Sequence, residues 1–296
     1  MGRWCMAEGR GVLRIAGLDR VGFLQGLVSN DASKATVSRA IWAALLTPQG
    51  KYLHDFFLVE SDGSLLLEGE RDRLPDLLRR LKLYKLRSRV DLTDASEELA
   101  VALAWGDGAT TELGLPRERG AAAPVDGAVA FVDPRLSALG ARVLGPAGLL
   151  SASIAGRGLV PGTADEWDTL RVTNGVPDGS RDMEVEKAIL LENGFDELGG
   201  CDWQKGCYVG QELTARTKYR GLVKKRLLPV AIEGPVPPPG TVVKLGEQEA
   251  GEMRSAAGNR GLALLRLEML PQALAGVPFT AGAALLRPSK PDWVAA

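Results

Sequence analysis

Histidine and cysteine are scarce in this sequence, whose 296 residues contain one histidine, His54, and three cysteines. A single histidine excludes a His–His zinc site within one chain, and any Ser–His or Cys–His catalytic pair would have to use His54. Cys5, Cys201 and Cys207 are too few and too scattered for a disulfide framework, so they indicate a reducing compartment. A two-histidine zinc site within the chain, and catalytic pairs that would use a histidine other than His54, are therefore excluded.

Long apolar runs and an excess of charge are also missing. The longest apolar runs, such as Leu99–Trp105, are far shorter than the ~20 residues that span a bilayer. Residues 1–8 lack the apolar core of a secretory signal, so we expect a cytoplasmic protein with no membrane contact. A formal net charge of −1 supplies no global field to attract nucleic acid, and no direct nucleic-acid partner is expected.

Local patterns predict a helix after Asp19, with apolar positions Phe23, Leu24, Leu27 and Val28, followed by an antiparallel meander. Strands are expected at residues 41–46, 51–60 and 64–68, and turns between them at Thr47–Gly50 and Ser61–Gly63. Leu74, Leu77, Leu78 and Leu81 then mark an amphipathic helix. Further strands are expected at residues 99–105, 128–132 and 141–144, and a capping box at Thr163–Glu166 opens a helix.

The length of the chain predicts two domains, with three as the alternative, by the soft prior of ~100–200 residues per domain. The first is expected at residues 1–222, of which 90–160 form a scaffold lobe without a chemical motif. Short strands then recur at residues 227–232, 241–245, 250–254, 261–267 and 284–287. This spacing predicts a small β-barrel or sandwich as the C-terminal domain, at residues 223–296.

Cys207 lies in a setting that favours a reactive thiol. Gly199, Gly200 and Gly206 predict an irregular loop around it, and a helix of about ten residues is expected to start at Gly210. Backbone N–H groups at a helix N-terminus favour a thiolate, and Lys205 adds positive charge. The alternative is an inert, buried cysteine. An iron–sulfur cluster typically needs four thiolates, so any cluster here would be transient or shared with a partner.

A run of basic residues surrounds this cysteine. Between residues 205 and 226 only Glu212 opposes seven basic side chains: Lys205, Arg216, Lys218, Arg220, Lys224, Lys225 and Arg226. Such a patch could steer an anionic ligand, whereas the plain alternative is a solvated helix face. Few aromatic residues are interleaved for base stacking, which disfavours RNA.

The run Lys205–Glu212, KGCYVGQE, resembles the hallmark of the YgfZ family of folate-binding proteins, and Leu213–Thr217 resembles its mitochondrial branch. Order and spacing fit that family from about residue 10 to about residue 270. The other matching runs are Phe23–Asp31, Ala44–Lys51, Tyr84–Arg87 and Arg171–Pro177.

This resemblance implies an α+β fold with two intertwined α/β lobes around a central folate cavity, closed by the small β-barrel. It implies tetrahydrofolate as cofactor, no resident metal, and a role in maturation of [4Fe–4S] proteins through Cys207. Partners would be iron–sulfur assembly factors and client [4Fe–4S] proteins; bacterial relatives also affect tRNA modification. The candidate folate-binding residues are Asn30, Asp31, Arg171, Lys205, Tyr208, Gln211, Glu212 and Arg216.

Simpler roles stand beside some of these assignments. Asn30 and Asp31 could instead form a plain turn at the end of a helix, and Arg171 a surface salt bridge. His54 could act as a general base, although a strand residue that faces a polar cavity or solvent is the simpler interpretation.

The runner-up is a folate-dependent aminomethyltransferase of the glycine cleavage T-protein type, to which the family is related in fold. Asp55 lies near the place of that enzyme's catalytic carboxylate and is the second catalytic candidate after Cys207. Thr173 stands where those enzymes tend to have a glutamate, and they lack the cysteine run, so we rank this activity second. The third hypothesis is a non-catalytic module that binds folate only to stabilise the fold.

Overall fold

The computed structural model describes residues 1–294, and its chain divides into two compact units. The first unit comprises Met1–Leu46, Leu53–Trp167 and Gly199–Val209. The second comprises Thr47–Tyr52, Asp168–Leu198 and Gly210–Ala296, the last described as far as residue 294. No helix in the described residues is long and apolar enough to cross a membrane.

One sheet of the first unit has six strands in the order β11-β1-β7-β10-β9-β8. They are β1 (Arg3–Met6), β7 (Leu99–Trp105), β8 (Ala122–Val125), β9 (Ala128–Val132), β10 (Ala141–Pro146) and β11 (Val160–Pro161). Small strand residues such as Ala102, Ala104 and Ala130 are fully buried, which lets the short helices α3 (Ala109–Glu112) and α4 (Leu150–Ala155) pack closely on them.

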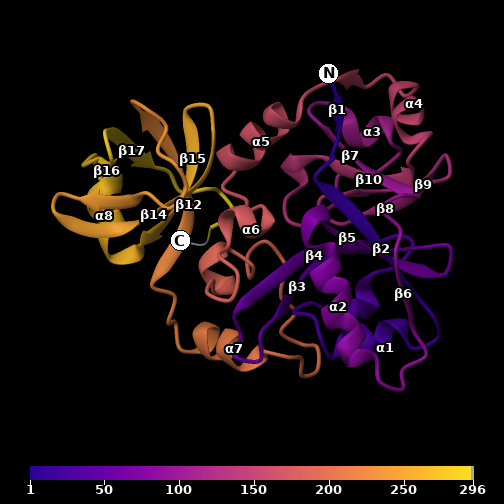
Figure 1. Ribbon diagram of the computed structural model, residues 1–296. Helices are drawn as coiled ribbons and strands as arrows, with labels where there is room; N and C mark the ends of the chain where they lie inside the picture. Colours follow the sequence, from indigo (N-terminus) through magenta and orange to yellow (C-terminus); the bar gives the residue numbers. More distant parts are fainter. Residues whose placement is uncertain (295–296) are drawn as a thin grey trace. The chain divides into compact units, whose positions relative to one another are not determined.

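The other sheet of the first unit has five strands in the order β3-β4-β5-β2-β6. They are β2 (Arg10–Ala16), β3 (Ile41–Leu46), β4 (Tyr52–Ser61), β5 (Ser64–Glu70) and β6 (Asp91–Asp94). Helix α2 (Leu74–Lys85) buries Leu74, Leu77 and Leu81, and it lies beside this sheet (Figure 1). The helix and the three expected strands β3, β4 and β5 are therefore confirmed. Helix α1 (Arg20–Gln25) and the 3₁₀ turns η1 (Ala32–Lys34), η2 (Arg71–Arg73) and η3 (Ser137–Leu139) complete the unit.

A buried ionic network connects the two sheets of the first unit. Arg142 on β10 donates from Nη1 to both carboxylate oxygens of Glu68 on β5, at 2.8 and 2.9 Å, and from Nε to Asp133 at 3.2 Å. Arg135 pairs with the same Asp133, and the guanidinium of Arg142 lies 4.0 Å from the ring centroid of Phe57. The segment expected to be a scaffold without chemistry therefore holds buried charges, each with its partner.

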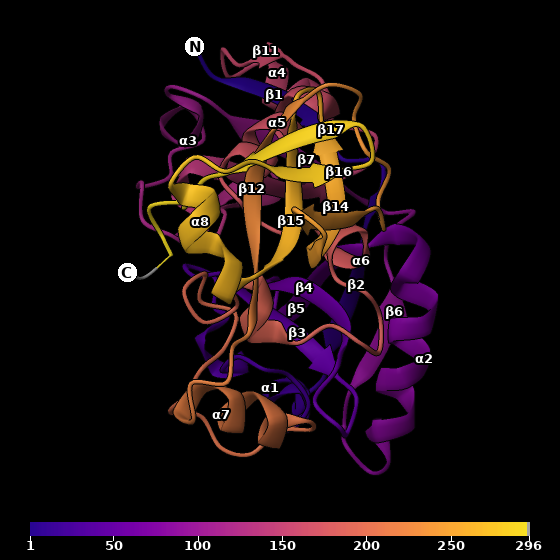
Figure 2. The ribbon, with the colours of Figure 1, turned by 90° about the vertical axis from the view of Figure 1, so that its left-hand side faces the viewer.

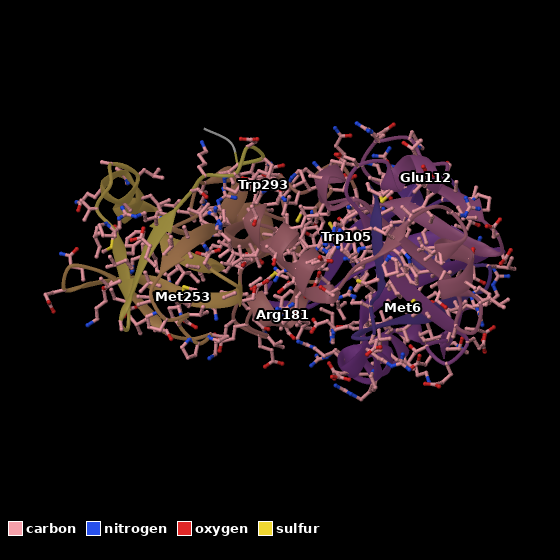
Figure 3. All side chains as sticks on the ribbon, turned by 90° about the horizontal axis from the view of Figure 1, so that it is seen from above. Met6, Trp105, Glu112, Arg181, Met253 and Trp293 are labelled. Atoms are coloured by element: carbon pink, nitrogen blue, oxygen red, sulfur yellow. The ribbon has the colours of Figure 1, made fainter. Side chains whose placement is uncertain are left out.

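The second unit contains a closed barrel in the order β12-β15-β14-β13-β16-β17 (Figure 2). Its strands are β12 (Lys225–Glu233), β13 (Val242–Leu245), β14 (Gln248–Ala257), β15 (Arg260–Arg266), β16 (Phe279–Ala281) and β17 (Ala284–Pro288). Met253, labelled in Figure 3, and Phe279 are fully buried in the barrel core. Five of these strands were expected from the sequence, and the barrel is confirmed; only the three-residue β16 was missed.

Helices complete the second unit. They are α6 (Gly179–Asp182), α7 (Gln211–Tyr219), α8 (Leu270–Leu274), the 3₁₀ turns η4 (Leu190–Asn193) and η5 (Leu267–Met269), and the part of α5 (Ala164–Thr173) from Asp168 on. The first turn of α5, up to Trp167, belongs to the first unit. The capping box before α5 is confirmed, because Thr163 N donates to Glu166 Oε2 at 3.0 Å and Glu166 N donates to Thr163 Oγ1 at 3.2 Å.

Candidate functional site

Residues Gly199–Val209, which we call the Cys207 loop, contain no helix or strand and belong to the first unit. Hydrogen bonds attach the start of this loop to the segment Gly26–Asn30. Ser29 Oγ donates to Gly200 O at 2.6 Å, and Asn30 Nδ2 donates to Gly199 O at 2.8 Å. At the far end of the loop, Val209 N donates to Gly26 O at 3.1 Å. The loop is therefore held at both ends by one short stretch of chain.

Lys205 supplies the central attachment. Its ammonium donates to Val28 O at 2.6 Å and to Asn30 O at 2.7 Å, and it lies 5.0 Å from the ring centroid of Tyr208. The side chain is 9% exposed, and burial lowers the pKa of Lys205 to about 8, while Asp31 and Asp202 oppose that shift. Lys205 thus uses a buried charge to fix the loop.

Asp202 shapes the turn that precedes Lys205. Its Oδ1 accepts the backbone N–H groups of Gln204 at 2.8 Å and Lys205 at 3.0 Å, and its Oδ2 pairs with Lys34. Between this turn and the attachment at Val209, Gly206 and Cys207 are exposed, whereas Tyr208 is buried.

Cys207 is the exposed member of the three cysteines, since Cys5 and Cys201 are buried. Burial raises the pKa of the Cys5 thiol to about 11, and Glu166 adds to that shift. Within residues 1–294 no group of three or more histidine, cysteine or acidic side chains could hold a metal ion. The alternative of a buried Cys207 is wrong, whereas the reactivity of its thiol stays a prediction. Three residues separate it from α7, and stabilisation of its thiolate stays a prediction.

Asn30 and Asp31 form the end of the segment that holds the loop. Asn30 Nδ2 also donates to Trp42 O at 2.7 Å, and Asn30 Oδ1 accepts from Asp31 N at 2.8 Å. Asp31 caps η1 by accepting from Ser33 N at 3.0 Å. Both residues therefore perform the structural role that the sequence offered as an alternative, and contact with folate stays a prediction.

Asp55 and His54 are both buried on β4. Asp55 Oδ2 accepts from Trp42 Nε1 at 2.9 Å, so the indole orients this carboxylate. His54 Nε2 lies 2.9 Å from Asp76 Oδ2, and burial lowers the pKa of His54 to about 4 against the opposing effect of Asp76. The neutral imidazole thus donates its N–H to Asp76. His54 is a strand residue with a polar partner and does not face solvent, and a general-base role stays a prediction.

Arg171 belongs to the second unit and is fully buried, so the alternative of a surface salt bridge is wrong. Its Nη1 donates to Asp182 Oδ2 and Val176 O at 2.7 Å, and its Nη2 donates to Ser255 Oγ at 2.9 Å. The guanidinium joins α5 to strand β14, and its role in folate binding stays a prediction. No pattern in the sequence had pointed to Asp182, the buried carboxylate that pairs with Arg171.

Gln211, Glu212 and Arg216 lie on α7 in the second unit, where Glu212 and Arg216 are exposed. The basic run is less positive than its sequence indicates, because Lys218 pairs with Asp196 at 2.6 Å and Arg226 with Glu197 at 2.8 Å. These acids precede the run in the chain, so counting charges within it missed them.

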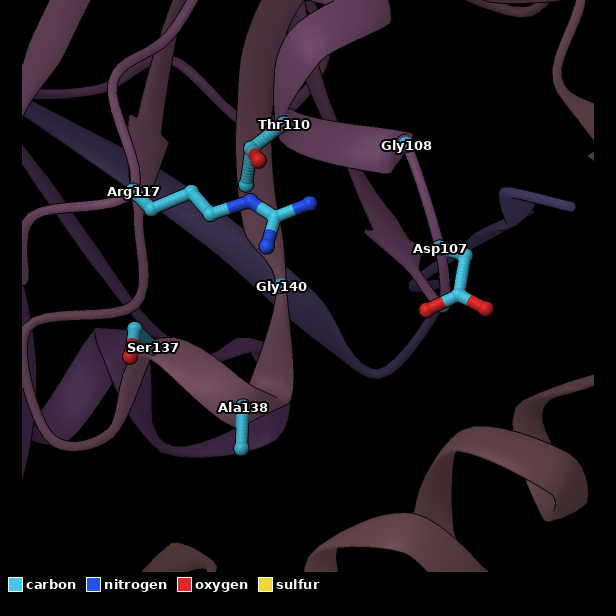
Figure 4. A pocket seen from close by; sticks show the side chains of 8 residues that line it. Asp107, Gly108, Thr110, Arg117, Ser137, Ala138 and Gly140 are labelled. Atoms are coloured by element: carbon cyan, nitrogen blue, oxygen red, sulfur yellow. The ribbon is translucent and has the colours of Figure 1, made fainter.

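A pocket of about 320 Å³ lies in the first unit beyond the end of β7, away from the expected site residues. Arg117 extends across it above Gly140, with Asp107 and Gly108 on the far side (Figure 4). None of the site residues expected from the sequence lines this pocket.

Comparison with known proteins places the chain in a family. Residues 224–296 match the model described as the CAF17 C-terminal beta-barrel domain. The mitochondrial iron–sulfur cluster assembly factor IBA57 of Mus musculus is 34% identical, covering 89% of this chain and 77% of that protein. The same factor from Homo sapiens is 33% identical, covering 97% and 83%. A Mycosarcoma maydis homologue is 37% identical over 79% of this chain, but the match spans 58% of that protein.

These relatives overturn one expectation. They are named as mitochondrial proteins, so the cytoplasmic location inferred from the sequence is wrong. Scarce, unpaired cysteines indicate a reducing compartment without telling one such compartment from another.

The fold also has a counterpart among solved structures. The glycine cleavage system aminomethyltransferase T from Bartonella henselae matches with a TM-score of 0.77 at 13% identity, covering 99% of this chain and 86% of that chain. This likeness confirms the expected fold and says nothing about activity. By its sequence identity to the mouse and human proteins, the chain belongs to the IBA57 family of iron–sulfur cluster assembly factors.

Proposed function

We propose that this chain assists the assembly of iron–sulfur clusters, with the Cys207 thiolate as a ligand to a cluster that it shares with a partner protein. The observation that carries this proposal is an exposed thiol on a loop attached on both sides, at Lys205 and at Val209. A fixed thiol meets an incoming cluster with little loss of conformational entropy. The names of the curated relatives supply the class of reaction.

The number of ligands that an iron–sulfur cluster needs explains why the cluster would be shared with a partner. Iron–sulfur clusters are usually held by four thiolates, and the other two cysteines of this chain are buried. The remaining ligands would therefore come from the partner, an assembly factor or a client [4Fe–4S] protein. Release of the cluster then needs only one bond to this chain to break.

Cluster binding tests this proposal directly. Anaerobic titration of a cluster-loaded assembly factor should form a complex with wild type and with the buried-site control Cys201→Ser. With Cys207→Ser, the change in charge-transfer absorption that accompanies complex formation should be lost. This variant should not restore [4Fe–4S] enzyme activity to cells that lack this factor. Full activity of Cys207→Ser in both assays would refute the role of the thiol.

Tetrahydrofolate is the proposed small-molecule ligand, supported by the resemblance of the Lys205–Glu212 run to folate-binding proteins. Calorimetric titration of tetrahydrofolate into wild type and into Cys207→Ser should give equal affinities, because the thiol serves the cluster. Absence of heat with wild type would remove folate from the mechanism and leave the cluster role untouched.

The aminomethyltransferase alternative is not favoured. Asp55, its catalytic candidate, is buried and accepts a hydrogen bond from Trp42. Turnover of tetrahydrofolate with an aminomethyl-lipoyl carrier, lost in Asp55→Asn, would reinstate it.

A further inference from the structure

The end of helix α2 and the chain that follows it, residues 82–89, carry exposed apolar side chains. Leu83 is 66% exposed and Leu86 is 89% exposed, and Tyr84 between them is exposed as well. The chain turns from here back to β6 (Figure 2). Single exposed leucines are ordinary on a protein surface, whereas several within one short segment mark a contact surface. We call residues 82–89 the α2 tip.

Leu18, from a distant part of the sequence, lies beside the α2 tip and is 77% exposed. Its neighbour Asp19 accepts from Arg89 N at 2.8 Å and donates from its own backbone N–H to Arg89 O at 3.3 Å. Both segments belong to the first unit. A fourth large apolar side chain is therefore held at the surface in the same region.

Leu86 lowers the stability of the folded chain in two ways. It ends α2 with φ +40° and ψ −111°, a conformation that L side chains rarely adopt and that suits glycine. Its side chain is also exposed to water, so burial within the chain does not offset the strain. A strained residue that contributes no packing points to a use outside the fold of the chain itself.

Positive charge surrounds these apolar side chains. The basic residues of the α2 tip are Lys82, Lys85, Arg87 and Arg89. Arg89 pairs with Asp19, and Lys85 approaches Asp91 only to 3.9 Å. Among residues 1–294 no carboxylate pairs with Lys82 or Arg87. The α2 tip contains no acidic residue, in a chain of formal net charge −1, so a partner with negative charge is favoured.

We propose that the α2 tip binds the surface of an anionic phospholipid membrane. Its leucines and tyrosine enter the boundary between headgroups and acyl chains, and its lysines and arginines contact the lipid phosphates. Such a contact needs no spanning helix. It departs from the expectation of no membrane contact, which considered only a signal sequence and the length of apolar runs.

The arrangement along the α2 tip favours a membrane over an acidic protein. Basic and apolar residues alternate in a segment of eight residues, so long basic side chains reach the headgroups while the neighbouring leucines enter the apolar layer. A fluid bilayer adapts to an exposed segment of this kind, whereas a protein partner needs a surface of complementary shape.

Flotation with lipid vesicles tests the proposal on the full chain. Wild type should bind vesicles made of equal parts of phosphatidylcholine and phosphatidylglycerol, and it should not bind vesicles of phosphatidylcholine alone. Added salt should weaken the binding, because it screens the attraction between the basic side chains and the anionic lipid. Equal binding to both kinds of vesicle, or binding to neither, would overturn the proposal.

The variant Leu86→Gly separates membrane contact from folding. Glycine relieves the backbone strain, so the melting temperature should be no lower than that of wild type. Affinity for the mixed vesicles should fall by about tenfold, because one leucine no longer enters the apolar layer. The matched control is Leu149→Gly, at an exposed leucine outside the α2 tip, which should bind as wild type does.

The double variant Lys85→Gln, Arg87→Gln removes two charges from the α2 tip and should weaken vesicle binding by about thirtyfold at low salt. Its control, Lys244→Gln with Lys290→Gln, removes two charges from exposed positions of the second unit and should bind as wild type does.

Two results with these variants contradict the proposal: both α2-tip variants bind vesicles as wild type does, or a control is the variant that loses affinity. Unchanged vesicle binding by Leu86→Gly, together with loss of its complex with a cluster-loaded assembly factor, would assign the α2 tip to an acidic protein instead.

Discussion

Replacement of Lys205 by methionine separates the charge of this side chain from its packing. Methionine keeps most of the apolar stem and removes the ammonium that donates to Val28 O and Asn30 O. Hydrogen bonds to charged groups contribute about 1.5–3 kcal/mol each, so the pair contributes about 3–6 kcal/mol. The ammonium is also buried, and a pKa lowered from 10.5 to about 8 corresponds to an opposing cost of about 3 kcal/mol. The difference is a net loss of about 0–3 kcal/mol for Lys205→Met, and we expect about 2 kcal/mol because the carbonyls of Val28 and Asn30 also lose their donor.

Urea unfolding and hydrogen exchange measure this effect at two levels. The free energy of unfolding should fall by about 2 kcal/mol, and amide exchange should accelerate in residues 199–209 more than in the barrel strands. The folded chain releases the Lys205 proton near pH 8 and the unfolded chain near pH 10.5. Between these values the unfolded state binds more protons, so wild type gains stability relative to Lys205→Met as the pH rises.

The control is Lys82→Met, at an exposed position on α2. It should change the free energy of unfolding by no more than about 0.5 kcal/mol and leave the exchange of residues 199–209 unaltered. If Lys205→Met behaves in the same way, the attachment of the Cys207 loop does not depend on this charge and the reasoning fails.

Three further outcomes are expected. Burial lowers the pKa of His54 to about 4, so as the pH falls the imidazole is protonated in the unfolded chain before it is protonated in the folded chain. The free energy of unfolding should therefore fall by up to about 3 kcal/mol between about pH 6.5 and pH 4. His54→Gln should flatten that part of a plot of urea midpoint against pH. Arg171→Met leaves the buried carboxylate of Asp182 unpaired and should cost about 3–5 kcal/mol in urea unfolding, whereas a loss below about 1 kcal/mol would contradict its structural role. Gly50→Ala places a Cβ 2.6 Å from Leu213 Cβ at a backbone φ of +78°, so the melting temperature should fall by several degrees; an unchanged melting temperature would show that the turn relaxes freely.

Much of the fold could be predicted because its signals are local. The apolar run Ile41–Leu46 became β3, and residues 99–105 became β7 with the same bounds. The capping box at Thr163–Glu166 depends on residues three apart, which suffice to form it. Strand β2 (Arg10–Ala16) was missed because glycine and arginine interrupt its apolar residues, so its sequence shows no regular alternation.

The sequence by itself determined many of the strands, the all-β character of the C-terminal domain and the identity of the motif cysteine. Tertiary structure alone decided how charges are paired and which thiol is exposed. Arg142 meets Glu68 across 74 residues, and Lys205 meets the carbonyls of Val28 and Asn30 across 177 and 175 residues. Periodicity and turn chemistry describe neighbours along the chain, whereas a buried charge is stabilised by whatever group the fold brings within about 3 Å. For that reason Cys207 could be named from its motif, but its exposure on an anchored loop emerged only from the folded structure.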